Sequence, residues 1–315
     1  MRQKTVFLTG LGLTILLATL GLVMMSGSGA LAQGDPTPTL APLAEPVLGD
    51  FDPASIADID LADYPVVPEI SDQAKLLYQA AIDQGSNPHT FVKIGDCMTD
   101  NEFFMIPLGE EGYDLGEYSD LEPVIEQFID GDLNSFSRKS QAAAGGFNSA
   151  SILDSMWANP EFCEAGENPL TCEFRHMEPS VALIMFGTND VYYLDEKQFD
   201  FFLRSIIVET IRHGALPVLS TFPNRPEFPE KAVLFNQIVV KAALDYDIPL
   251  INLWLALEDL PNQGVDPEDT THLTEPEEGN AATFTETNLE TGFVVRNLVT
   301  LQALDAVLKA VSAEE

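Results

Sequence analysis

The stretch Ser180-Val-Ala-Leu-Ile-Met-Phe186, followed at once by Gly187-Thr188-Asn189-Asp190, decides the fold expected for this chain. Seven residues without a charge and without alternation are typical of a strand that is buried on both faces of a parallel sheet. The polar block that follows lies where open parallel sheets collect their working side chains, beyond the carboxyl ends of the strands. Other strands that end in polar residues should meet it at the same edge.

Strands and helices alternate on both sides of this stretch. The strands are expected at residues 91–94, 180–186, 216–221 and 248–254, and the helices at residues 72–83, 121–129, 150–157, 198–213, 231–246 and 292–311. Such alternation predicts an α/β protein, a three-layer α/β/α sandwich around a central parallel sheet. About 245 residues, 71–315, are enough for one large domain with its own core.

The amino terminus has the pattern of an export signal. Two basic residues, Arg2 and Lys4, precede an apolar run at residues 6–25, and Ala30-Leu31-Ala32 fits a cleavage site, so residues 1–32 are interpreted as a signal peptide. The run is also close to the ~20 residues that span a bilayer, so an uncleaved N-terminal anchor is the alternative. Both interpretations predict a secreted or extracytoplasmic domain, with a possible membrane tether through residues 6–25.

Residues 33–70 are rich in Pro, Ala and Asp and lack a sustained apolar period. This composition predicts a linker, which either tethers the following domain or wraps around it.

The chain is strongly acidic, with 15 Lys and Arg against 50 Asp and Glu and a net charge of -35. Such a surface repels nucleic acid and anionic lipid headgroups, which excludes both as partners. The charge is interpreted as a device for solubility or as adaptation to a salty or acidic medium; the alternative is an acidic face for cations or a basic partner.

Three cysteines in an exported protein leave one unpaired. Cys163 and Cys172 bracket a short segment in which Gly166 and Pro169 turn the chain back, so this pair is expected to form a local disulfide. Cys97 is then the free thiol, although pairing of Cys97 with one of the other two is the alternative.

Cys97 follows the first expected strand, where Gly95-Asp96 forms a turn that exposes the next side chain. Near the carboxyl terminus, Asp269 and His272 are separated by two residues. This gap lets the carboxylate contact one ring nitrogen while the other faces a nucleophile, as in a catalytic triad. Asp266 is the rival partner of the histidine, six residues away.

Four blocks in this order resemble the SGNH hydrolase superfamily, also called the GDSL family of esterases and lipases. They span about 180 residues and are Gly95-Asp96-Cys97, Ala144-Gly145-Gly146-Phe147-Asn148-Ser149, Gly187-Thr188-Asn189-Asp190 and Asp269-Thr270-Thr271-His272. Cysteine stands where the family has its nucleophilic serine. The resemblance implies a flavodoxin-like sandwich and a hydrolase of ester-linked acyl groups, with glycan and lipid esters both open as substrates and with neither metal nor cofactor.

Carried over to these positions, the resemblance implies that Cys97 attacks the ester carbonyl, His272 takes the thiol proton and Asp269 holds the imidazole tautomer. The oxyanion hole would combine the backbone N–H groups of Cys97 and Gly146 with the side-chain amide of Asn189. A thiol beside an imidazole is chemically competent, because an adjacent imidazolium favours the thiolate.

Asp96 would support the site by shaping the turn. The departure from serine leaves a second function open, a catalytically silent extracellular domain that only binds a ligand on the same fold.

The remaining candidates have plainer interpretations. His213 is expected to cap a helix, and His89 and His176 are expected in loops without the spacing of metal ligands. The acidic run after His272 is interpreted as solvated, with cation binding as the alternative; it consists of Glu275, Glu277 and Glu278. Tyr192 and Tyr193 either line a substrate groove or pack above the sheet.

Overall fold

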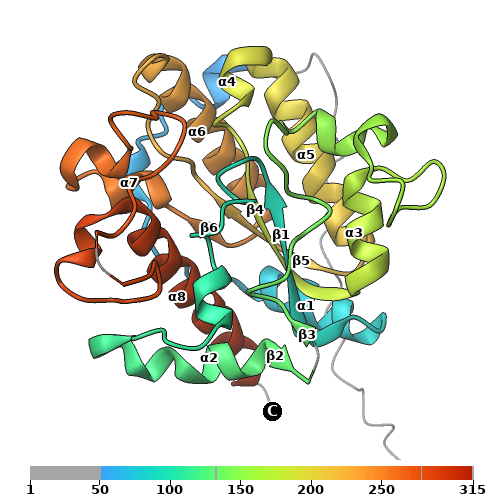
Figure 1. Cartoon of the computed structure of the whole chain (residues 1–315). Helices are drawn as coiled ribbons and strands as arrows, with labels where there is room; N and C mark the ends of the chain where they lie inside the picture. The colour runs from blue at the N-terminus through green and yellow to red at the C-terminus, as the bar shows by residue number, and fades with distance from the viewer. Residues whose placement is uncertain (1–50, 132, 278, 314–315) are drawn as a thin grey trace, which may run out of the picture. The chain divides into compact units, whose positions relative to one another are not determined.

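The structure, a computed structural model, describes residues 51–131, 133–277 and 279–313 (Figure 1). The expected signal segment, residues 1–32, and the first part of the expected linker, residues 33–50, lie outside the described residues. Within the described ranges no helix is both long and apolar enough to cross a membrane.

The centre of the domain is a parallel sheet with the strand order β1-β4-β5-β6. These strands are Asn87–Gly95 (β1), Pro179–Met185 (β4), Leu216–Ser220 (β5) and Leu250–Ile251 (β6). On the free edge of β1, Gly95 forms a parallel bridge with Ala143. The chain segment at Ala143 therefore takes the place of a fifth strand, and the order becomes the 2-1-3-4-5 of flavodoxin-like folds.

Helices cover both faces of the sheet, which confirms the predicted three-layer sandwich. On one face lie α1 (Asp72–Asp83) and α8 (Gly292–Ser312), and on the other lie α3 (Pro169–Met177), α5 (Glu196–Arg212) and α6 (Pro229–Tyr246) (Figure 1). Shorter elements complete the domain: α2 (Glu122–Gln127), the antiparallel pair β2 (Ile129–Asp130) and β3 (Leu133–Asn134), α4 (Asp190–Tyr193) and α7 (Leu253–Leu257).

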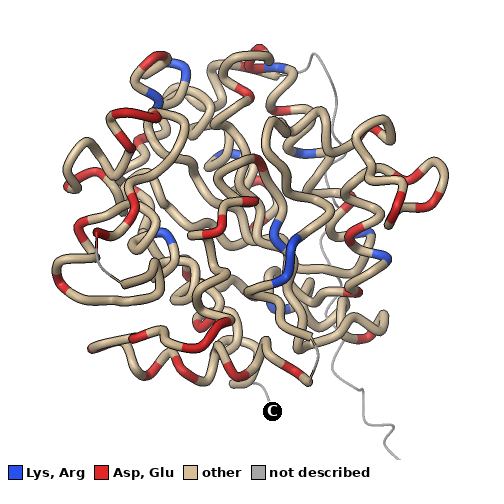
Figure 2. The backbone as a smooth tube through the Cα atoms, viewed as in Figure 1, with Lys and Arg blue, Asp and Glu red and all other residues tan. Residues whose placement is uncertain are grey.

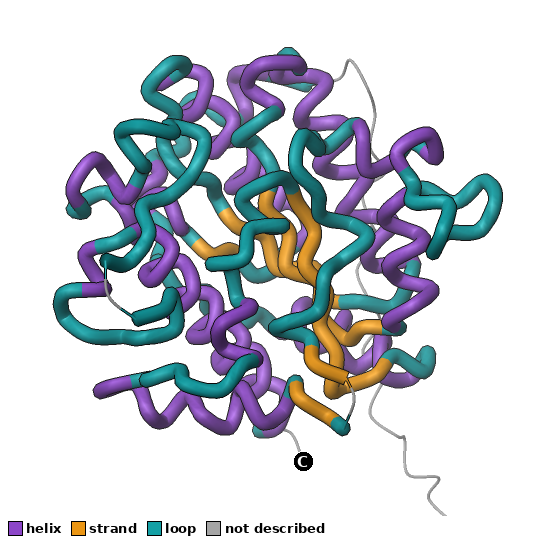
Figure 3. Tube along the Cα trace, viewed as in Figure 1, coloured by secondary structure: helices purple, strands orange, loops and turns teal. Residues whose placement is uncertain are grey.

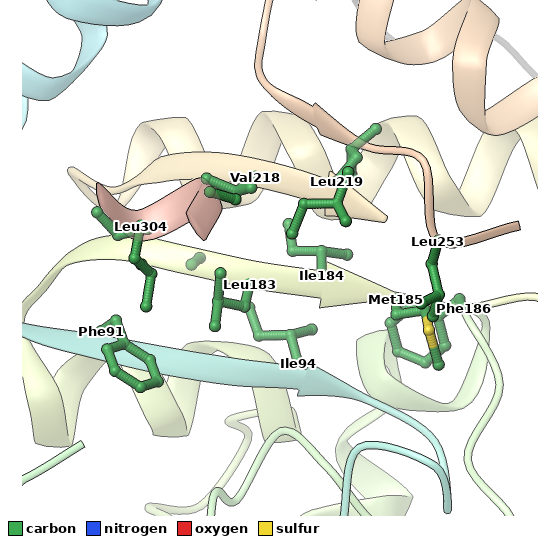
Figure 4. Close-up of a cluster of buried hydrophobic side chains, with 14 of the residues drawn as sticks. Phe91, Ile94, Leu183, Ile184, Met185, Phe186, Val218, Leu219, Leu253 and Leu304 are labelled. Atoms are coloured by element: carbon green, nitrogen blue, oxygen red, sulfur yellow. The ribbon is translucent and has the colours of Figure 1, made fainter. Parts of the chain in front are cut away.

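The core forms where the sheet meets its helices. All seven residues of β4 are buried, as the uncharged run at 180–186 predicts. Figure 4 shows side chains of β1, β4 and β5 beside Leu304 of α8. Phe91 of β1 contacts the rings of Phe128 and Phe136 edge to face, with centroids 5.1 and 5.0 Å away, which anchors the 128–136 segment to the sheet.

Three expected elements differ from those observed. Residues 150–157 form two 3-10 turns rather than a helix, because the Asp154 side chain accepts from the Met156 N–H and starts a new turn. The expected strand at 248–254 ends after Ile251, because Asn252 accepts from the Leu255 N–H and begins α7. The expected helix at 121–129 is shorter, as residues 129–130 belong to β2.

The helix α3 was not predicted, and two histidine assignments were wrong. Cys172 and His176 lie in α3, and His89 lies in β1, so neither histidine is in a loop. His213 is the C-cap residue of α5, as expected.

Residues 51–70 pack against the domain instead of projecting from it. Ile56 and Leu61 are buried in the core, and the side-chain amide of Asn252 donates to the carbonyl oxygens of Leu61 and Tyr64, at 2.7 and 2.9 Å. This part of the predicted linker is therefore a wrap around the sheet, held from the start of α7.

Candidate active site

Cys97 lies in a tight turn directly after β1. Gly95 ends the strand, and a side chain at this position would collide with Thr99 and with the Met185 carbonyl of β4. One carboxylate oxygen of Asp96 accepts from the Met98 N–H at 3.0 Å, which closes the turn. The Cys97 thiol is partly exposed and is the free cysteine of the chain, whereas Cys163 and Cys172 form the predicted disulfide.

Arg296 of α8 contacts the same turn through two hydrogen bonds. Its guanidinium is buried and donates to the Met98 carbonyl at 2.5 Å and to the Thr99 hydroxyl at 3.1 Å, and it lies over the ring of Phe104. Burial lowers the pKa of Arg296 to about 9. No local pattern in the sequence indicates this role for Arg296, because its contacts join positions far apart in the chain.

The environment of Cys97 disfavours the thiolate. Burial, and then the charge of Asp96, raise the pKa of the thiol to about 12. Burial also raises the pKa of Asp96 to about 7, and its second carboxylate oxygen has no hydrogen-bond partner among the described residues. At neutral pH the thiol is therefore protonated, and it needs a base before it can act as a nucleophile.

The expected base, His272, and its expected orienter, Asp269, are in contact. His272 Nδ1 lies 2.7 Å from the Asp269 carboxylate, and the His272 N–H donates to the Asp269 carbonyl at 2.8 Å. The hydrogen bond from His272 lowers the pKa of Asp269. Because Nδ1 faces Asp269, Nε2 is the ring nitrogen available to a nucleophile.

Asp266, the rival orienter, has a different role. Its carboxylate accepts from the Glu268 N–H at 2.8 Å, and its backbone N–H donates to the His272 carbonyl at 3.0 Å. Asp266 therefore shapes the loop, whereas Asp269 contacts the imidazole.

Two of the three expected oxyanion donors, Gly146 and Asn189, lie on loops that contact each other. Gly146 is exposed, has a φ of 84° and follows the bridge between Ala143 and Gly95 by three residues, which places it beyond the end of β1. The Asn189 amide donates to the Phe147 carbonyl at 2.8 Å, so this side chain is already oriented toward the Gly146 loop.

A buried carboxylate, Asp190, joins these two loops. It accepts from the backbone N–H and hydroxyl of Ser149, at 2.8 and 2.5 Å, and from the Gly187 N–H at 2.9 Å. The pKa of Asp190 is raised by burial. The sequence blocks contain both partners, but only the fold shows that Asp190 acts on Ser149, 41 residues away.

The register of β1 against β4 places Cys97 and Asn189 at the same edge of the sheet. Gly95 pairs with Met185, so Cys97 is two residues and Asn189 four residues beyond the same level. Figure 3 shows loops gathered beyond this end of the strands. The two tyrosines after Asn189 differ in environment. Tyr192 packs on Phe228, while Tyr193 is 71% exposed.

One cluster has the composition of a metal site. In the described part of the chain, ligand atoms of Cys163, Glu167 and Cys172 lie within 4.8 Å of one another. The two sulfurs are bonded to each other, so neither is a thiolate that could bind a metal. Glu275 and Glu277 of the acidic run are exposed, and Glu278 lies outside the described residues.

No protein-family model matches this chain, and no curated protein matches it. Solved structures similar to it include the esterase EstA from Pseudoalteromonas sp., with 15% identity, 71% of this chain and 99% of that chain covered, and a TM-score of 0.43. TesA has 16% identity over 70% and 99%, with a TM-score of 0.44. Axe2, an acetylxylan esterase from Geobacillus stearothermophilus, has 14% identity over 70% and 94%, with a TM-score of 0.43.

Proposed function

We propose that this chain is an ester hydrolase of the SGNH type that removes acyl groups through a Cys97-His272-Asp269 triad. The contact between His272 and Asp269 carries the proposal, because it occupies Nδ1 of the imidazole and leaves Nε2 available to take the proton of Cys97, which follows the last residue of β1 by two positions. Carboxylate, imidazole and nucleophile are the minimum set for covalent catalysis of acyl transfer.

The chemistry has two halves. His272 Nε2 takes the thiol proton as Cys97 attacks the ester carbonyl, and the tetrahedral oxyanion is stabilised by the N–H groups of Cys97 and Gly146 and by the Asn189 amide. Collapse forms a thioester, and the alcohol leaves with the proton from His272. Water then gives its proton to His272 and attacks the thioester, which releases the carboxylic acid and restores the thiol.

The resting thiol makes the base essential. A thiol whose pKa is raised to about 12 is almost fully protonated at neutral pH, so attack must be coupled to proton transfer. The same observation favours a second candidate function, a silent domain that binds an acyl, glycan or lipid ligand without cleaving it.

Two features support a location outside the cytoplasm. The Cys163–Cys172 disulfide is typical of an oxidising compartment, and the first 32 residues have the pattern of an export signal or of an anchor through residues 6–25. The net charge of -35 favours neutral ester substrates over anionic ones.

Hydrolysis of p-nitrophenyl acetate tests the triad. We expect Cys97→Ala and His272→Ala each to lose about 10²-fold or more in kcat/KM, the contribution typical of a general base or its nucleophile. His176→Ala is the matched control, because His176 is exposed on α3 and any hydrolysis by surface imidazoles is common to all variants. Hydroxylamine release of an acyl group from Cys97 would identify the thioester.

Cys97→Ser separates the two functions. If the parent hydrolyses no faster than Cys97→Ala while Cys97→Ser gains activity, the fold keeps a working site and the native thiol does not cleave esters. That result would contradict the proposed ester hydrolase and favour the second candidate function, a domain that binds a ligand without cleaving it.

A further inference from the structure

Three side chains connect the loop after β5 to the loop that bears His272. Arg225 begins this connection: it is 1% exposed, and it donates to the Thr188 carbonyl at 2.7 Å and to the Tyr192 hydroxyl at 2.9 Å. Its guanidinium also lies over the Tyr192 ring, at 5.1 Å from the centroid. Arg225 is therefore fixed to the block that contains Asn189.

Glu227 continues the connection on the surface. One carboxylate oxygen lies 3.5 Å from Nη2 of Arg225, and the other accepts a hydrogen bond from the Thr270 hydroxyl. That hydrogen bond is the largest cause of the lowered pKa of Glu227. Thr270 is the residue directly after Asp269, so the contact holds the short turn between Asp269 and His272.

The turn needs such support because its working side chains are open to solvent. The Asp269 side chain is 56% exposed and the His272 side chain 31%. Their mutual hydrogen bond fixes the ring relative to Asp269 but does not fix the pair relative to Cys97. A displacement of about 1 Å in a catalytic group can cost on the order of 10²-fold in rate.

We propose that Glu227 and Thr270 are positioning residues, which with Arg225 set the place of His272 relative to Cys97. Arg225 is suited to anchor them, since it is buried and its charge acts on both Cys97 and Asp96. The bridge thus joins the base to the edge of the sheet that holds the nucleophile. The inference rests on the Cys97–His272 pair of the proposed function.

Paired variants of the full chain test this bridge. Thr270→Val removes the hydroxyl and keeps the shape, whereas Thr270→Ser keeps the hydroxyl. Glu227→Gln removes the charge, and Glu230→Gln, three residues on and exposed in the first turn of α6, is its matched control. Thermal unfolding is measured alongside to confirm that each variant is folded.

Alkylation of Cys97 by iodoacetamide across the pH range is the first measurement, because it reports on the thiol and its base without requiring ester hydrolysis. We expect Thr270→Val and Glu227→Gln to move the pH profile toward that of His272→Ala, and Thr270→Ser and Glu230→Gln to keep the parent profile. In ester hydrolysis, kcat should fall about tenfold to a hundredfold in the first two variants with KM unchanged.

The outcomes separate this inference from the proposed function. If His272→Ala slows alkylation while Thr270→Val and Glu227→Gln do not, the bridge has no positioning role, and the triad stands. If both variants follow His272→Ala but the parent cleaves no ester, the bridge holds and the hydrolase fails. An alkylation rate that does not depend on His272 overturns the inference, because no pair then exists to be positioned.

Discussion

Asp96 and Cys97 are neighbours in the sequence, and their ionisation is coupled. The pKa of Asp96 is raised to about 7 by burial, so its carboxyl is neutral in acid and charged in base. Burial of the thiol is the main reason why the pKa of Cys97 is raised to about 12, and the charge of Asp96 is the second reason. Since a nearby negative charge opposes formation of the thiolate, Asp96 should restrain the thiol mainly above neutral pH.

Asp96→Asn should release this restraint. Asparagine keeps an oxygen for the Met98 N–H, so the turn is preserved while the charge is lost. We expect alkylation of Cys97 to be up to about tenfold faster than in the parent above about pH 8, the effect of one pKa unit, and the difference to shrink below about pH 7. The measurement is the rate of adduct formation by mass spectrometry.

Asp100→Asn is the control for this experiment, because Asp100 is a partly buried carboxyl near the same turn whose charge is not among the causes of the Cys97 shift. Equal alkylation rates for Asp96→Asn and the parent at every pH would show that the Asp96 charge does not reach the thiol.

At the scale of elements, the disulfide fastens α3 to the loop before it. Cys172 is fully buried in α3, and Cys163 lies nine residues earlier in a partly exposed loop. Closing a loop of this size lowers the entropy of the unfolded chain, which contributes about 2 to 3 kcal/mol to stability.

Cys163→Ala removes this link and leaves Cys172 as a small buried apolar residue. We expect the free energy of unfolding to fall by about 2 to 3 kcal/mol, measured by urea denaturation. A reducing agent should lower the stability of the parent to the same level and leave the variant unchanged. Coincident unfolding curves for variant and parent without reductant would contradict a stabilising role.

Continuous apolar or helical patterns in the sequence predict complete helices and strands. The helix expected at 72–83 is α1 to the residue, and the expected strand at 180–186 is β4 displaced by one. The signal for α3 is also present, since Asn168 and Thr171 form a capping box around Pro169. The two cysteines and the glycine between them, Gly166, favour instead a simple reversal of the chain. Capping chemistry outweighs the turn residues here.

Elements that depend on distant partners are not visible in a local pattern. Asn252 caps α7 locally, but its amide also donates to carbonyls of the 61–64 segment, about 190 residues earlier, and no local pattern predicts that contact. The residues of the candidate site also fall into two groups, those that a local sequence pattern indicates and those that it does not. Cys97 and His272 lie in contiguous blocks that the sequence displays, whereas Arg225 and Arg296 contribute through contacts that only the folded chain brings together.

Over the whole molecule, acidic residues outnumber basic ones by 50 to 15. Figure 2 shows acidic residues distributed over many loops and helices of the domain. Several of the basic residues are withdrawn from the surface: Lys93 donates to a backbone carbonyl inside the fold, and Arg225 and Arg296 are buried as well. Asp96, Glu173, Asp190 and Asp200 are buried too, so the exposed surface remains strongly acidic and its charges repel one another.

This repulsion predicts that salt stabilises the domain. Raising NaCl from about 0.01 M to about 0.15 M shortens the Debye length from about 30 Å to about 8 Å, which screens distant like charges. We expect Tm to rise by roughly 2 to 4 °C, equivalent to about 1 kcal/mol for a domain of this size. Tetramethylammonium chloride at equal ionic strength should have the same effect, since screening does not depend on a bound cation. If Tm falls instead, ion pairs such as Arg204 with Asp200 outweigh the net repulsion, and the acidic surface does not limit stability.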